Sequence, residues 1–226
     1  MDMHTATVAS TVPPRSGFAG FFSGVQDAPW YRLFLAPALA ELQGLPAGSR
    51  VLDVGTGPGR FIELGMQQLA LSWVGVDTDE AMLAQARRRP TLDGVPLRRV
   101  EPAGALPFDD RTFDAVCLCS VLFTIPDPEP LLGQALRLLR PHGKIIVLTP
   151  SGRADLRTAL TVPARAGGTI RNWTFFLWYA MTRSGARRWT HADLLADVTR
   201  KQDIVYHKRI VFEGLALLET LEPRLG

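Results

Sequence analysis

The stretch Val51-Leu52-Asp53-Val54-Gly55-Thr56-Gly57-Pro58-Gly59-Arg60 decides the fold of this chain. An apolar run brings Asp53 to the end of a strand, and three glycines then follow at alternate positions. Glycine lets the backbone turn tightly against a ligand, and the first turn of a following helix offers N–H groups that have no partner within the helix. The stretch therefore predicts a strand, a ligand-binding loop and a helix, the first unit of an α/β fold.

A second carboxylate, Asp77, ends the apolar run Trp73-Val74-Gly75-Val76, eighteen residues beyond Gly59. An ionised Asp accepts hydrogen bonds from two vicinal hydroxyls, so a carboxylate at the end of a second strand suits a ribose. Together the two segments predict a site for a nucleotide-type cofactor.

The glycine spacing separates two classes of cofactor. Dinucleotide-binding folds use G-x-G-x-x-G, and Arg60 stands where that third glycine would be. Here the pattern is G-x-G-x-G, with Asp53 two residues before the first glycine. A carboxylate at this place repels a pyrophosphate and attracts an ammonium, so we expect a ligand with a positively charged amino group.

This spacing and charge resemble motif I of the class I S-adenosylmethionine-dependent methyltransferases. Two further segments carry the resemblance. The run Leu106–Val116 is similar to the family's "LPF…FDxV" segment before the fourth strand, and Leu139–Lys144 is similar to its "LxPGG" turn before the fifth. About residues 49–150 therefore correspond to the family's core.

The resemblance implies an α/β, Rossmann-like doubly wound sheet of seven strands, mostly parallel with an antiparallel last strand. It also implies S-adenosyl-L-methionine as the cofactor, with S-adenosyl-L-homocysteine as its product. We expect residues 1–17 to form a flexible tail and residues 18–226 a single methyltransferase domain. Its parts are expected to be a helical cap (18–48), the cofactor-binding core (49–150), a helical insert or lid after the fifth strand (151–189), and a last helix from Thr190 with the closing strands (190–226).

Carried over position by position, the resemblance implies that Asp53 and the glycine loop meet the amino-acid end of the cofactor and Asp77 its ribose. Thr78 and Met82 would line the adenine side, although Met82 equally fits a plain core position. The cofactor-binding residues predicted in this way are Asp53, Gly55, Thr56, Gly57, Gly59, Asp77, Thr78, Met82, Glu101, Ala103, Gly104, Cys119, Ser120 and Phe123.

The chain departs from the family pattern at two places. Pro102 stands where an Asp beside the adenine amino group is common, so Glu101 substitutes for it or the backbone of Ala103 and Gly104 makes the contact. Phe123 replaces a histidine often seen after the fourth strand, and it either packs beside the sulfonium or fills the core. No catalytic base can be assigned, and Tyr31 and Tyr179 are the candidates for a catalytic role.

The insert combines dense aromatic residues with arginines over residues 165–188. Three interpretations stay open: a helix buried against the core or a dimer partner, a lid over an apolar substrate pocket, and an interfacial segment that rests on anionic lipid. The substrate-binding residues predicted from the cap and the insert are Tyr31, Trp173, Phe176 and Tyr179.

Composition narrows the remaining choices. The 226 residues suffice for one α/β domain with a modest addition, and a net charge of +3 falls short of the basic surface of a nucleic-acid binder. The two cysteines, Cys117 and Cys119, predict neither a disulfide framework nor a zinc site, and no other metal site is expected. The first 17 residues lack the features of a secretory signal, so we expect a cytoplasmic protein, a monomer or homodimer, with peripheral membrane contact through the insert as an option.

These observations predict a methyltransferase that acts on a small, apolar or lipid-like acceptor. Two rivals are a catalytically silent S-adenosylmethionine-binding regulatory or assembly protein and an aminopropyl transferase. The second needs acidic residues to hold a polyamine, whereas the expected lid is aromatic and basic.

Overall fold

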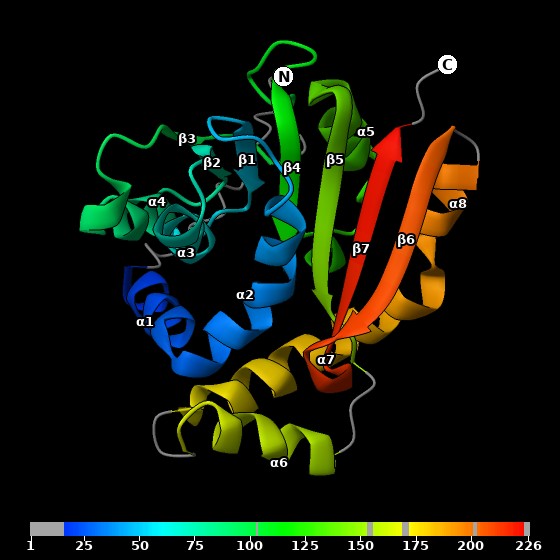
Figure 1. The fold of residues 1–226 in the computed structure, drawn as a ribbon. Helices are drawn as coiled ribbons and strands as arrows, with labels where there is room; N and C mark the ends of the chain where they lie inside the picture. The colour runs from blue at the N-terminus through cyan, green and yellow to red at the C-terminus, as the bar shows by residue number, and fades with distance from the viewer. Residues whose placement is uncertain (1–15, 103, 153–155, 169–171, 201–202, 224–226) are drawn as a thin grey trace, which may run out of the picture.

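Seven strands form one mixed sheet in the order β3-β2-β1-β4-β5-β7-β6 (Figure 1). The computed structural model describes residues 16–102, 104–152, 156–168, 172–200 and 203–223. The strands are β1 (Arg50–Val54), β2 (Ser72–Asp77), β3 (Leu97–Arg99), β4 (Phe113–Cys119), β5 (Leu139–Pro150), β6 (Ile204–Val211) and β7 (Ala216–Pro223).

Strand directions confirm the fold predicted from the sequence. The strands β1 to β5 pair in parallel, and β7 runs antiparallel to both β5 and β6. Central strands of a parallel sheet are covered on both faces, which explains why β1 and β4 read as nearly continuous apolar runs.

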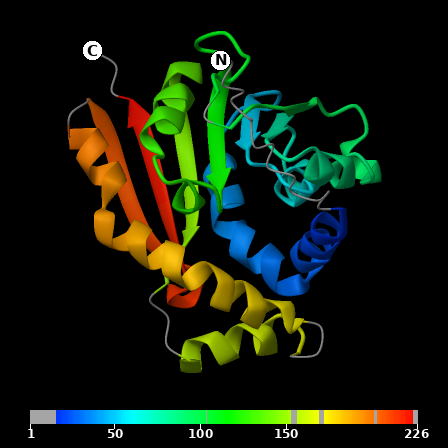
Figure 2. The ribbon, with the colours of Figure 1, turned by 180° about the vertical axis from the view of Figure 1, so that it is seen from behind.

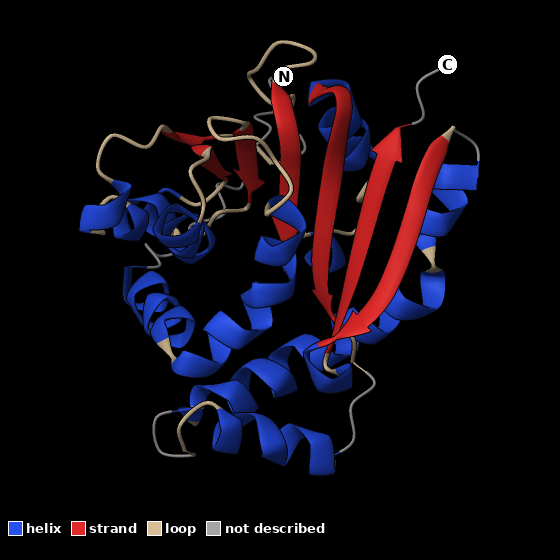
Figure 3. Cartoon of the chain, in the orientation of Figure 1, coloured by secondary structure: helices blue, strands red, loops and turns tan. Residues whose placement is uncertain are grey.

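Helices cover both faces of the sheet and extend beyond one end of it (Figures 2 and 3). Among the described residues they are α1 (Ser16–Asp27), α2 (Pro29–Leu42), α3 (Arg60–Gln68), α4 (Glu80–Ala86), α5 (Glu129–Leu138), α6 (Leu156–Arg165), α7 (Thr174–Ala192) and α8 (Leu194–Arg200), with short 3₁₀ turns η1 (Pro90–Leu92), η2 (Leu122–Thr124) and η4 (Phe212–Gly214). The helices α2 and α3 pack on one face, and α5 and α8 on the other.

The cap and the insert meet beyond the carboxyl ends of the parallel strands. Buried rings from α2 and α7 form one cluster there, with Trp30 5.0 Å from Trp178 and Phe34 5.1 Å from Trp178 between ring centroids. Phe175 lies 5.3 Å from Trp30 in the same cluster. Ligands of open α/β sheets bind outside this end of the strands, so the cap and insert cover the place where a site is expected.

The structure bears on two boundaries predicted from the sequence, the start of the last helix and the end of the N-terminal tail. The expected start of the last helix at Thr190 is wrong, because α7 continues through Thr190 to Ala192 and the chain turns at Asp193, whose φ is +46°. Thr190 is buried, and its hydroxyl donates to the Ser151 carbonyl at 2.9 Å, so a tertiary contact holds it inside the helix. The predicted tail falls almost wholly outside the described residues, since α1 begins at Ser16.

Candidate cofactor site

The glycine loop after β1 adopts a backbone that side chains disfavour. Gly55, Gly57 and Gly59 have φ values of +70°, +55° and +80°, in the left-handed region. A Cβ at Gly55 would collide with the Val121 side chain, and one at Gly59 would lie 2.5 Å from Leu92. The loop therefore requires glycine for two reasons: its positive φ angles and, at Gly55 and Gly59, the close approach of neighbouring side chains.

Asp77 holds this loop in place. Its carboxylate accepts hydrogen bonds from the backbone N–H of Gly57 at 2.7 Å and of Asp79 at 2.9 Å. Burial raises the pKa of Asp77, while these two N–H groups oppose that shift. A carboxylate has about four lone-pair positions, so acceptor capacity remains for hydroxyl groups of a ligand. The ribose contact stays a prediction, and the structure adds a second role for Asp77 in shaping the loop.

Asp53 lies buried at the end of β1 with 2% of its surface exposed. Burial raises the pKa of its carboxyl to about 7, the nearby Thr56 hydroxyl lowers it, and Asp77 raises it. Within the part of the chain that the structure describes, Asp53 Oδ2, Thr56 Oγ1 and Ser120 Oγ are buried without a hydrogen-bond partner. Buried polar groups are normally paired, so these three atoms fit a ligand that supplies the missing partners. An ammonium beside Asp53 would do so and would stabilise the ionised carboxylate.

The cap closes over this group of residues. The Gln26 amide donates to the Tyr31 hydroxyl at 3.2 Å, and Gln26 also lies against Gly57. The space left between the walls is about 10 Å³, room for about one water molecule. The walls are Gln26, Tyr31, Leu35, Asp53, Gly55, Thr56, Phe61 and Cys119. A group larger than a water molecule can occupy this space only when its walls move apart.

Arg89 joins the cap to the glycine loop. Its guanidinium donates to the Pro58 carbonyl at 2.6 Å, to Glu63 at 2.7 Å and to Asp27 of α1 at 2.7 Å. In the sequence, Arg89 follows two other arginines just after the end of α4 at Ala86. Nothing local in the sequence indicates a contact to residues 62 positions away.

The adenine-side residues are spread over several segments. Met82 is buried in α4, whereas Thr78 is exposed and uses its carbonyl to accept from Arg99 at 3.4 Å. Glu101 is exposed and pairs with Arg99 at 3.3 Å, and Gly104 follows in the same loop. Ala103 lies outside the described residues. Their contacts to a cofactor stay predictions.

The segment after β4 is divided between the site and the core. Cys119 lines the pocket, and burial raises the pKa of its thiol, which keeps it protonated. Ser120 has φ +63°, a strained value for a residue with a side chain. Phe123 packs against Gly185 of α7, where a Cβ would lie 3.0 Å from its ring, and it belongs to the core cluster on the other face of the sheet. Of its two interpretations, the structure favours the core.

One of the four predicted substrate contacts reaches the pocket. Tyr31 lines it, and burial raises the pKa of the Tyr31 hydroxyl well above its ordinary value. Phe176 and Tyr179 pack on Phe175, at 5.6 Å and 6.3 Å between ring centroids. Trp173, which directly precedes α7, is 55% exposed and is not among the residues that line the pocket.

Asn172 fastens the insert to the cap. This fully buried side chain accepts from the Trp30 N–H at 3.0 Å and donates to the carbonyls of Ala166 at 3.1 Å and Gly168 at 2.7 Å. The Trp30 indole N–H donates to the Thr174 hydroxyl at 3.0 Å. Asn172 could not be identified from the sequence as a contact to the cap, because Trp30 lies 142 positions away along the chain.

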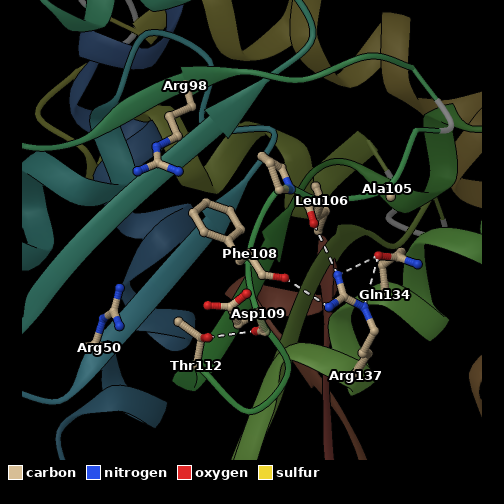
Figure 4. A pocket seen from close by; sticks show the side chains of 10 residues that line it. Arg50, Arg98, Ala105, Leu106, Phe108, Asp109, Thr112, Gln134 and Arg137 are labelled. Carbon is tan, nitrogen blue, oxygen red and sulfur yellow. Dashed lines mark hydrogen bonds between the residues drawn. The ribbon is translucent and has the colours of Figure 1, made fainter.

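A larger groove of about 600 Å³ lies around the amino ends of β1 and β4 (Figure 4). Arg50 and Arg98 stack on the rings of Phe113 and Phe108, each 5.2 Å from the ring centroid. This groove opens at the end of these strands opposite to Asp53, so it is separate from the candidate cofactor site. Across the described residues there is no group of three or more His, Cys, Asp or Glu side chains that could hold a metal ion.

Comparison with known proteins agrees with this geometry. Residues 52–147 match the family described as a methyltransferase domain. The demethylmenaquinone methyltransferase of Renibacterium salmoninarum is 32% identical over 180 residues, which cover 76% of this chain and 70% of that protein. The phosphatidylethanolamine N-methyltransferase of Cereibacter sphaeroides is 32% identical over 109 residues, which cover 47% of this chain and 53% of that protein. The chain spans about half the length of several curated relatives that it matches.

Solved structures show the same architecture. A Methanococcus maripaludis protein assigned as an S-adenosyl-L-methionine-dependent methyltransferase superposes with a TM-score of 0.73 over 98% of this chain and 99% of that chain. The two sequences are 14% identical, so this likeness concerns the fold.

Proposed function

This chain belongs to the class I S-adenosylmethionine-dependent methyltransferases, and we propose that it transfers a methyl group from S-adenosyl-L-methionine to a small, apolar or lipid-like acceptor. The observation that carries the proposal is the buried, unpartnered carboxylate oxygen of Asp53 beside the glycine loop. A buried carboxylate at this place calls for a cation, and the amino group of the methionine moiety supplies one.

Residues of the loop and of β2 hold the donor in this proposal. Asp53 receives the ammonium, and the loop Gly55–Gly59 lets the backbone approach the amino-acid end. Asp77, already fixed by two backbone N–H groups, accepts from the ribose hydroxyls with its remaining lone pairs. Thr78 and Met82 lie next along the chain on the adenine side.

When bound, S-adenosyl-L-methionine supplies a sulfonium methyl group that is already activated for in-line displacement. The protein's task is then to orient an acceptor atom and to exclude water, and positioning alone lowers the barrier substantially. Tyr31 remains a neutral hydroxyl because burial raises its pKa. It therefore orients its neighbours by hydrogen bonding and does not act as a phenolate base. No histidine is among the described residues that line this pocket.

An apolar acceptor suits the aromatic surroundings of Tyr31, which packs on Trp30 and Phe34. The cap and insert join there through the rings of Trp30, Phe34, Phe175 and Trp178. The names of two relatives point the same way, one to a quinone and one to a phospholipid. Substrate contacts by Phe176 and Tyr179 at the edge of this cluster, the oligomeric state and a cytoplasmic location stay predictions.

The test is calorimetric titration with S-adenosyl-L-methionine, S-adenosyl-L-homocysteine and NAD. We expect micromolar binding of the two sulfur ligands and none of NAD, and we expect Asp53→Ala to abolish the first two. Transfer of labelled methyl to quinone and phosphatidylethanolamine acceptors would then establish the enzyme. Tight binding without turnover on a broad acceptor panel would support the silent regulatory protein, and no binding of either sulfur ligand would refute the proposal.

A further inference from the structure

Charge is distributed very unevenly along the chain. Residues 156–192, which include α6 and α7, contain six arginines and no Asp or Glu. The rest of the chain has 19 basic and 22 acidic side chains and is net acidic. The positive charge of the protein is therefore concentrated in the insert. A block of this kind favours contact with an anionic partner.

The helix α7 has two distinct faces. Phe175, Trp178, Ala186 and Trp189 are each at most 8% exposed and face the core. The opposite side carries exposed residues at the spacing of one helical face. We call this side the outer face of α7. It consists of Ala180, Met181, Ser184, Arg187 and Arg188, together with Trp173, which directly precedes the helix.

The outer face is apolar in its first half and cationic in its second. Trp173 is 55% exposed and Met181 is 59% exposed, which are high values for large apolar side chains. Arg187 and Arg188 follow, with Arg183 exposed beside them. The Arg183 guanidinium stacks on Tyr179 at 5.9 Å, and the Arg187 Nε–H donates to the Gly152 carbonyl at 3.0 Å, so both side chains are held in place although both residues are exposed.

Helices that lie in a lipid interface combine large apolar side chains, which enter the acyl boundary, with Lys and Arg, which meet the headgroups, and the outer face of α7 offers both kinds, one in each half. No helix of the described residues is long and apolar enough to cross a membrane, which leaves contact from one side. We propose that the outer face of α7 docks the protein on an anionic phospholipid surface, with Trp173 and Met181 inserted and Arg183, Arg187 and Arg188 at the headgroups.

Docking in this manner deepens the proposed function, because it names the source of a lipid-like acceptor. The inner face of α7 packs on α2 through Trp178 and Trp30, and α2 carries Tyr31 to the cofactor pocket. A membrane held against α7 would thus lie one helix away from the shared wall of cap and insert. The docking itself needs no methyl donor, so it can be tested separately from catalysis.

Vesicle flotation provides the first test. The full chain is mixed, without donor, with vesicles of phosphatidylcholine alone or with 30% phosphatidylglycerol. We expect binding to the anionic vesicles only, and its loss at high salt. Each basic side chain near an anionic surface contributes about fivefold to partitioning, so Arg183→Gln with Arg188→Gln should weaken binding about 25-fold.

A matched control removes the same charge elsewhere. Arg88 and Arg98 are exposed on other parts of the molecule, near the end of α4 and on β3. We expect Arg88→Gln with Arg98→Gln to change vesicle binding less than threefold. Equal losses in the two double variants would mean that net charge alone attracts the protein, and the docking face would be refuted. Binding of S-adenosyl-L-methionine, measured in both, separates a failed docking surface from a failed cofactor site.

Tryptophan fluorescence gives a second, independent readout. Of the five tryptophans, Trp30, Trp73, Trp178 and Trp189 are each at most 8% exposed, and Trp173 alone is 55% exposed. Anionic vesicles should shift the emission to the blue and protect it from acrylamide, and Trp173→Phe should remove most of that change. No vesicle binding by the wild type, or an unchanged spectral shift in Trp173→Phe, would overturn the proposal. Concentration-dependent dimerisation without vesicle binding would instead assign this face to a second copy of the chain.

Discussion

The glycine loop and the insert lie at the same end of the sheet, yet they are held in different ways. The loop is fixed by its own torsion angles and by Asp77, which bonds to Gly57 across 20 positions of the chain. The insert is fixed by Asn172 and Thr174, whose bonds to Trp30 span 142 and 144 positions. Local backbone geometry therefore builds the glycine loop, and long-range side-chain contacts build the junction of cap and insert. A substitution that disrupts one of these two regions should therefore leave the other intact.

The largest effect is expected at Asp53. Because its pKa is about 7 when folded and near 3.8 otherwise, this group stabilises the fold fully below pH 3.8, and that contribution is lost as the pH rises through 7. At pH 8 the ionised, buried carboxylate lowers the stability of the free protein by up to roughly 4 kcal/mol. We expect Asp53→Asn to raise the free energy of unfolding at pH 8 by up to that amount, measured in urea, and to make little difference near pH 4.

The same variant should also bind the methyl donor more weakly. A neutral amide offers the ammonium no opposite charge, so Asp53→Asn should bind S-adenosyl-L-methionine at least tenfold more weakly. In the wild type, affinity should fall about tenfold per pH unit below pH 7, where the free carboxyl is protonated. Asp109→Asn, at an exposed carboxylate outside the site, is the control. A wild-type affinity that stays flat between pH 5 and 8 would contradict this account of Asp53.

A second prediction concerns the junction of cap and insert. Asn172→Ala leaves the Trp30 N–H and the carbonyls of Ala166 and Gly168 without their buried partner. We expect a loss of about 3 kcal/mol in unfolding free energy, measured by thermal and urea denaturation. Below the melting temperature, S-adenosyl-L-methionine should still bind, since the glycine loop is built separately. Thr174→Val, which removes one hydroxyl acceptor, should lose only about 1 kcal/mol.

The contrast between these two regions also explains what could be predicted from the sequence. The strand, glycine loop and helix of the first unit follow from a short pattern that acts on neighbouring residues, and the antiparallel last strand was implied by the family resemblance. Gln26, Arg89 and Asn172 were missed because an isolated Gln, an Arg in a basic run or an Asn in a loop has no local signature. Thr190 resembled a helix start in sequence, but its bond to Ser151 keeps it within α7. Long-range contacts to a packed surface are the information that a local pattern lacks.

A third prediction tests whether the loop and the ribose site are one unit. Asp77→Ala removes the acceptor for the Gly57 and Asp79 N–H groups as well as the predicted ribose contact. Affinity for S-adenosyl-L-methionine should fall by about 1.5–3 kcal/mol, measured by calorimetry. Asp77→Asn retains one acceptor oxygen and should show an intermediate loss. If the affinity of Asp77→Ala were unchanged, Asp77 would have no place in the site.

The smallest effect concerns the contact between the cap and the glycine loop. Asp27 on α1 is half exposed and pairs with Arg89, which keeps its bonds to Pro58 and Glu63 when Asp27 is changed. An ion pair this exposed contributes about 0.5 kcal/mol, so Asp27→Asn should increase the open population of the cap about twofold. Because the closed pocket leaves room for about one water, association and dissociation of S-adenosyl-L-methionine should both become about twofold faster at unchanged affinity. Stopped-flow fluorescence measures both rates.

The control is Glu80→Gln, which removes the exposed ion pair between Glu80 and Arg87 and should leave both rates unchanged. Identical rates in Asp27→Asn and wild type would show that α1 does not control entry, and the cap would have to open elsewhere along α2.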